Sequence, residues 1–152
     1  MQGIDSSDPT CQRFNSIRLH DSELRGIEMR YAGLESRPEN RYEIALKVNR
    51  CVPRLPHEEE RFQPTELRFL QVRYFSTDID LLGLTYCGGD ISDAKCSEDS
   101  GFLRKFFSDI VPNFNLPQDE KSLEGLKHFG IYLCNPSGEI NIIAKDYVLL
   151  TM

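Results

Sequence analysis

The chain has 152 residues, of which 39% are hydrophobic and 28% are charged, and its net charge is −6. This length and composition are typical of one domain with its own core and exclude a fully disordered protein. The acidic balance argues against binding nucleic acid or an anionic membrane surface, because both attract an excess of Lys and Arg. No run approaches the roughly 20 apolar residues that a membrane-spanning helix needs.

The N-terminal residues 1–12 are polar, and they lack the basic and apolar stretches of a secretory signal. We therefore expect a flexible N-terminal segment in a cytoplasmic protein. The cysteines are odd in number and far apart, so they are expected to be reduced thiols that pack as small hydrophobic side chains. They are Cys11, Cys51, Cys87, Cys96 and Cys134.

Alternating hydrophobic and polar residues predict two strands, at 24–31 and 42–49. In the second strand, Tyr42, Ile44, Leu46 and Val48 share one face, and the polar residues between them share the other. One apolar and one polar face is typical of an antiparallel sheet that covers a core on one side. Residues 33–40 and 51–64 contain prolines and charged runs and are expected to be loops.

Residues 66–75 predict a further strand in which the alternation changes phase. Leu67 and Phe69 share one phase, whereas Val72 and Tyr74 share the other. Such a change predicts a β-bulge or a bend near residues 70–71. Residues 79–86 are apolar and fit either a short strand or a helical turn.

A helix is predicted at 100–111, where apolar residues recur at spacings of three and four. Asp99 or Ser100 is expected to cap its N-terminus, and Pro112 is expected to end it. The apolar stripe consists of Phe102, Leu103, Phe106, Phe107 and Ile110.

The C-terminal part predicts a β-hairpin. Alternating residues at 129–133 and 140–144 flank a turn at 135–138 that contains Pro and Gly, and residues 147–150 extend the last strand or form another. We find no repeat or linker, so residues 1–152 are expected to be a single α+β domain. Its fold is expected to be a mainly antiparallel β-sheet of five to seven strands, with one principal helix near 100–111 packed on a face.

The densest polar cluster beside a predicted strand contains His20, Asp21 and Glu23. These residues are the candidate binding site, in which the histidine would act as a base or ligand beside carboxylates. The alternative is structural: Asp21 or Ser22 caps a turn, and His20 fills a partly buried position. Neighbours in a strand point to opposite faces, which argues against His20 and Asp21 acting on one atom.

No metal, cofactor or catalytic site is predicted. Structural zinc sites usually contain ligand pairs two to four residues apart, whereas Cys87 and Cys96 are nine apart. Whether these two thiols meet across a loop is left open by the sequence. The segment from Asp78 resembles a calcium-binding loop only at its start, because Leu82 and Gly89 occupy positions that need oxygen ligands.

The segment Leu19-His20-Asp21-Ser22-Glu23-Leu24, followed by an amphipathic strand, resembles the opening of certain small, poorly characterised bacterial families. Some of these families are grouped with immunity proteins of polymorphic toxin systems. The resemblance covers about thirty residues. It implies a cytoplasmic protein that binds another protein, with no catalytic residues to transfer.

Three functions are therefore weighed. The leading hypothesis is a non-catalytic protein-binding domain of the immunity or regulatory type, whose acidic charge favours encounter with a basic partner. The alternative is a small-ligand binder or enzyme with a pocket near His20, Asp21 and Glu23. A third hypothesis is a homo-oligomer that assembles through an exposed sheet edge.

Overall fold

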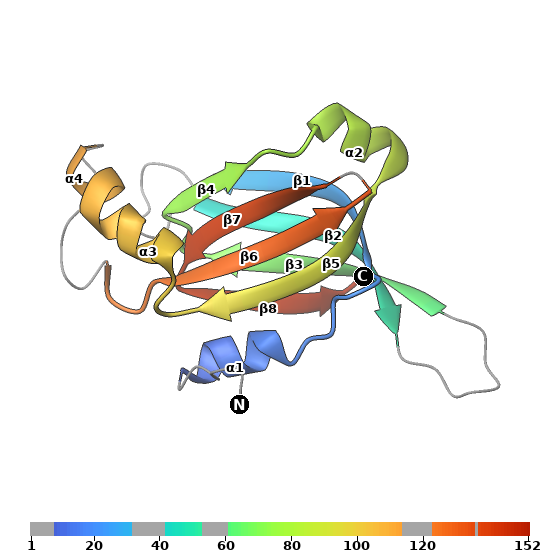
Figure 1. Ribbon diagram of the computed structural model, residues 1–152. Helices are drawn as coiled ribbons and strands as arrows, with labels where there is room; N and C mark the ends of the chain where they lie inside the picture. Colours follow the sequence, from blue (N-terminus) through green and yellow to red (C-terminus); the bar gives the residue numbers. More distant parts are fainter. Residues whose placement is uncertain (1–7, 32–41, 53–60, 114–122, 136) are drawn as a thin grey trace.

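The protein folds around one curved, antiparallel β-sheet, as Figure 1 shows. The computed structural model describes residues 8–31, 42–52, 61–113, 123–135 and 137–152. The predicted α+β class with a mainly antiparallel sheet is confirmed. The described residues form eight strands, in the order β4-β7-β6-β5-β1-β2-β3-β8, so the predicted number of five to seven was too low. The strands are β1 (Glu23–Tyr31), β2 (Tyr42–Val52), β3 (Arg61–Leu70), β4 (Tyr74–Thr77), β5 (Gly89–Ser97), β6 (Lys127–Cys134), β7 (Gly138–Ala144) and β8 (Asp146–Thr151).

The sheet curves so strongly that its halves form two layers. In Figure 1 the half β4-β7-β6-β5 lies in front of the half β1-β2-β3-β8. The layers are joined by two bends, because β3 leads into β4 and β7 leads into β8. The backbone N–H of Arg73 donates to the carbonyl of Ile143 (2.8 Å), and that of Lys145 donates to Leu70 (3.2 Å). The predicted bend near residues 70–71 is thus the point at which one chain segment changes layers.

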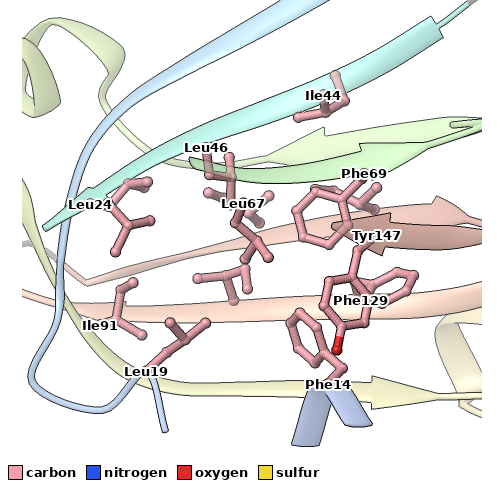
Figure 2. Close-up of a cluster of buried hydrophobic side chains, with 14 of the residues drawn as sticks. Phe14, Leu19, Leu24, Ile44, Leu46, Leu67, Phe69, Ile91, Phe129 and Tyr147 are labelled. Atoms are coloured by element: carbon pink, nitrogen blue, oxygen red, sulfur yellow. The ribbon is translucent and has the colours of Figure 1, made fainter. Parts of the chain in front are cut away.

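The core lies between the two layers and is rich in aromatic rings (Figure 2). Phe14, Phe69, Phe129 and Tyr147 come from four different elements, and each is at most 4% exposed. The ring centroids of Phe14 and Phe129, and those of Phe69 and Phe129, are 5.0 Å apart, in edge-to-face contact. Such pairs stabilise a core beyond the area that they bury.

The helix α1 (Pro9–Asn15) contributes Phe14 to this core, so residues 9–12 of the segment that was expected to be flexible form part of a helix. Asp8 caps the helix by accepting a hydrogen bond from the backbone N–H of Cys11, and Pro9 stands at the first helical position. Cys11 and Phe14 are 0% and 1% exposed. Their burial against the sheet stabilises a helix that is too short to be stable alone. Residues 1–7 lie outside the described residues.

The strands predicted from alternation are confirmed in β1, β2, β6, β7 and β8. The expected loop at 51–64 is partly wrong, since β2 continues to Val52 and β3 begins at Arg61. The loop at 33–40 lies outside the described residues. Residues 79–86 largely form the helix α2 (Leu81–Cys87), which ends at Gly88 with a φ of 71°. Strand β5 was not predicted.

The predicted helix at 100–111 is confirmed as three consecutive helical segments: α3 (Gly101–Lys105), the π-helical turn η2 (Phe106–Ile110) and α4 (Val111–Asn113). Ser100 is its N-cap, one of the two predicted. The helix packs through Leu103 and Phe106 on Ile143 of β7, outside the main core. Within the described ranges, no helix has the length and apolar character that crossing a membrane requires.

Candidate functional site

The predicted site residues lie in an exposed turn before β1. Nδ1 of His20 lies 3.1 Å from a carboxylate oxygen of Asp21, and both side chains are more than two-thirds exposed. Glu23 instead contacts Arg25 (3.1 Å) and accepts a hydrogen bond from Asn49 (3.4 Å). The structure therefore brings His20 and Asp21 together and gives Glu23 other partners. That these residues bind a ligand stays a prediction.

The backbone explains this turn. Asp21 has a φ of 68°, and its N–H donates to the carbonyl of Ile91 (3.0 Å). The N–H of Ile91 in turn donates to the carbonyl of Ser22 (2.8 Å), while the buried Ser22 hydroxyl accepts the N–H of Cys51 (2.9 Å). Aspartate tolerates the left-handed conformation better than most residues. His20 and Asp21 are thus not strand neighbours on opposite faces, as the sequence suggested, and His20 is not partly buried.

The residues considered for metal binding have other partners. Sγ of Cys96 lies 2.8 Å from Sγ of Cys11, and the side chain of Cys87 lies outside the described parts. Asp80 caps α2 through the N–H of Leu82, and Asp78 accepts the N–H of Glu139 (2.8 Å). Among the described residues, no group of three His, Cys, Asp or Glu side chains is placed to hold a metal ion.

A serine–histidine–asparagine chain joins α3 to the sheet. Nδ1 of His128 lies 2.9 Å from Oγ of Ser100, and Nε2 lies 2.7 Å from Oδ1 of Asn141. Because an amide oxygen only accepts, Nε2 carries the proton and Nδ1 accepts from the serine hydroxyl. Burial lowers the pKa of His128, so the ring is neutral.

This order of groups occurs in acyl-transfer enzymes, but its surroundings here are structural. Oγ of Ser100 accepts the N–H of Leu103 (3.0 Å) as the helix cap. The ring of Phe102 stacks on His128 with a centroid distance of 4.6 Å, and His128 is 8% exposed. We therefore interpret the hydrogen-bonded series Ser100–His128–Asn141 as a structural clamp that holds the N-terminus of α3 against β6.

Another polar cluster surrounds Glu66 on the outer face of the β1-β2-β3 layer. Arg30 donates two hydrogen bonds to this carboxylate (2.9 and 3.0 Å), Arg68 donates from Nε (2.8 Å), and Lys47 donates as well. These hydrogen bonds lower the pKa of Glu66 to about 2, and the largest contribution comes from Arg30. The carboxylate is only 5% exposed and stays ionised at neutral pH, so it is a poor proton donor.

An apolar cleft is bounded by β1, β4 and α2, elements that lie at the upper edge of the sheet in Figure 1. Its volume is about 290 Å³. Met29 and Leu81, on its rim, are 59% and 54% exposed, which is high for large apolar side chains. The residues that line the cleft are Gly26, Ile27, Met29, Ile44, Phe75, Leu81 and Leu84.

The cleft exists because β1 and β5 separate. In the described residues, β5 pairs with β1 only at Glu23 and Leu24, whereas β2 pairs with β1 along its whole length. Residues of β1 beyond Leu24 therefore have β2 on one edge, and alternate N–H and C=O groups point away from β2. On the core-facing side of β1, Ile27 is partly buried against the core, whereas Met29 is exposed.

Exposed aromatic side chains continue the apolar surface along these strands. Tyr31 and Tyr42 face each other across β1 and β2, with a centroid distance of 5.1 Å, and are 51% and 42% exposed. Their positions continue the alternation of Met29 on β1 and Ile44 on β2. Contiguous apolar surface of this kind marks binding sites in soluble proteins.

The sequence did not reveal the cleft. The alternation of Ile27, Met29 and Tyr31 predicted a half-buried strand face, but not that β5 leaves this face uncovered. Leu81 and Leu82, two adjacent apolar residues that begin a helix of only seven residues, indicate an exposed apolar surface, but they do not locate the cleft. Comparison of the chain with protein-family models, with curated proteins and with solved structures found no match.

Proposed function

We propose that this protein is a non-catalytic binding domain that takes up an extended segment of another protein in the cleft between β1, β4 and α2. The segment adds as a strand to the edge of β1 that, beyond Leu24, has no strand partner among the described residues, and its apolar side chains enter the cleft. The carrying observation is that, among the described residues, β1 loses its β5 partner after Leu24, where its core-facing residues Ile27 and Met29 line the cleft.

A strand-like partner fits this site better than a small molecule. The cleft volume of about 290 Å³ lies at the lower limit for small-molecule pockets. A free strand edge beside apolar pockets is the arrangement that binds extended peptides, since the edge supplies backbone hydrogen bonds and the pockets select alternate side chains. Met29 and Leu81 would be covered by such a segment.

Charge favours a basic segment. The net charge of the chain is −6, and Asp78 and Asp80 are exposed just before α2. Opposite charges on the two partners speed association and help to exclude wrong partners. Binding of another protein is also what the resemblance of residues 19–24 implies.

The test uses a peptide of alternating Val and Lys, titrated into ¹⁵N-labelled protein. We expect amide shifts in residues 25–31 and in α2. Leu81→Asp should weaken binding at least about tenfold, because it removes an apolar contact and adds a buried charge. Leu82→Asp is the matched control: Leu82 is 73% exposed but does not line the cleft, so this variant should bind normally.

A second peptide separates strand addition from simple apolar contact. It has the same sequence but carries N-methyl groups at alternate residues, which removes backbone donors and leaves the side chains in place. We expect its binding to be lost. Strand β8 also pairs with a single strand in the described residues, so amide shifts centred on β8 would refute the proposal. An equal loss of peptide affinity in the two leucine variants would refute it as well.

A further inference from the structure

The two most buried thiols of the described chain meet between α1 and β5. Sγ of Cys11 and Sγ of Cys96 are 2.8 Å apart although the residues are separated by 85 positions. Their exposures are 0% and 4%. Two thiolates bound to one tetrahedral zinc ion would lie about 3.8 Å apart, given Zn–S bonds of about 2.3 Å. The contact is therefore too short for a shared metal ion and suits direct bonding between the sulfurs.

Other contacts hold the two cysteines in this position. Nδ2 of Asn15 donates to the carbonyl of Cys96 (3.1 Å), and Oδ1 of Asn15 accepts the N–H of Cys96 (2.7 Å). One amide side chain on α1 thus binds both backbone groups of Cys96. Arg13 adds an ion pair with Asp146 of β8 (3.2 Å). The sulfurs are neighbours because the helix docks in one orientation.

We propose that Cys11 and Cys96 form an intramolecular disulfide under oxidising conditions, and that this bond fastens α1 to β5. With hydrogen peroxide as the oxidant, one thiolate attacks a peroxide oxygen, the O–O bond breaks, and a sulfenic acid and water form. The second thiol then attacks the sulfenic sulfur, the S–S bond forms, and a second water leaves. Two thiol hydrogens and one peroxide are consumed in total.

The closed structure sets the rate of this reaction. The pKa of Cys96 is raised, mainly by the hydrogen bond with the Cys11 thiol and secondly by burial. Little of the reactive thiolate is therefore present while α1 is packed on the sheet. We therefore expect oxidation to begin only when α1 transiently separates from the sheet. Once the disulfide forms, α1 can no longer leave.

The test compares reduced and peroxide-treated protein by peptide mapping. Thiols that remain after treatment are alkylated in denaturant, and the protein is digested and analysed by mass spectrometry. We expect a linked peptide pair containing Cys11 and Cys96 that has lost two hydrogen atoms, with Cys51 and Cys134 alkylated. Hydrogen exchange of the amides of α1 should become about tenfold slower or more after oxidation.

Variants supply the matched control. Cys96→Ala should abolish the linked pair, whereas Cys134→Ala should retain it. Cys134 is exposed and pairs with Asp90 at the start of β5, whereas Cys96 lies near the other end of that strand. Should Cys96→Ala fail to fold, the map of the unaltered protein decides alone. Full alkylation of Cys11 and Cys96 after treatment would overturn the proposal, as would a linked pair with unchanged exchange in α1.

Discussion

The charge cluster around Glu66 makes a quantitative prediction about stability. Glu66→Gln keeps the shape of the side chain but removes the negative charge that Arg30, Lys47 and Arg68 share. The variant therefore leaves three cations facing one another without their common partner. Removing one partner of a buried ion pair is usually more destabilising than the intact pair is stabilising.

The magnitude follows from the pKa of Glu66. A fall from 4.5 to about 2 corresponds to about 3 kcal/mol of preference for the ionised form in the folded state. The side chains of the three cations are each about one-third exposed, so solvent screens part of this energy. We therefore expect Glu66→Gln to lower the free energy of unfolding by about 2 kcal/mol at pH 7.

The lowered pKa of Glu66 also determines how its contribution to the stability changes with pH. Because folding lowers the pKa of Glu66, its stabilising contribution is complete above about pH 5 and is lost as the pH falls toward 2. In urea unfolding, the free energies of unfolding of wild type and variant should differ strongly at pH 7 and only slightly at pH 2.5. An equal difference at both pH values would refute the reasoning. Glu28→Gln, which removes an exposed partner of Arg30 alone, should leave the urea midpoint nearly unchanged.

Two further predictions concern the core and the helix clamp. Phe14→Ala should cost about 3–5 kcal/mol in urea unfolding, since it opens a cavity among three other rings, whereas Phe107→Ala, at a side chain 39% exposed, should cost far less. An equal cost would contradict the placement of α1. Because burial lowers the pKa of His128, stability should fall as the pH drops below about 6.5, and His128→Gln should remove this part of the dependence. An unchanged urea profile between pH 8 and 5 in that variant would show that another group is responsible.

The regular strands could be predicted from the sequence because their alternation is set by one buried face. Strand β2 shows this most clearly, with Ile44, Leu46 and Val48 all at most 3% exposed. Strand β5 escaped prediction because its register shifts between Ile91 and Asp93, which breaks the period of two. Helix α1 escaped because only Cys11 and Phe14 carry its burial in a polar stretch.

The candidate site could not be predicted, because it depends on tertiary pairing. Nothing in the residues of β1 reveals that β5 departs after Leu24, and the cleft exists only because it does. The cluster around Glu66 likewise joins residues from three strands, and Arg30 lies 36 positions from its carboxylate. Local patterns report which face of a strand is apolar, but they do not report what covers it.

The two bends that join the layers also have a consequence for biosynthesis. Strand β8 pairs with β3 and supplies Tyr147, which contacts Phe14 and Phe129. The ring cluster is therefore incomplete until residues 146–151 have left the ribosome. Until then, one edge of β3 and the aromatic side chains beneath it stay accessible to other nascent chains, and both features favour aggregation during this interval.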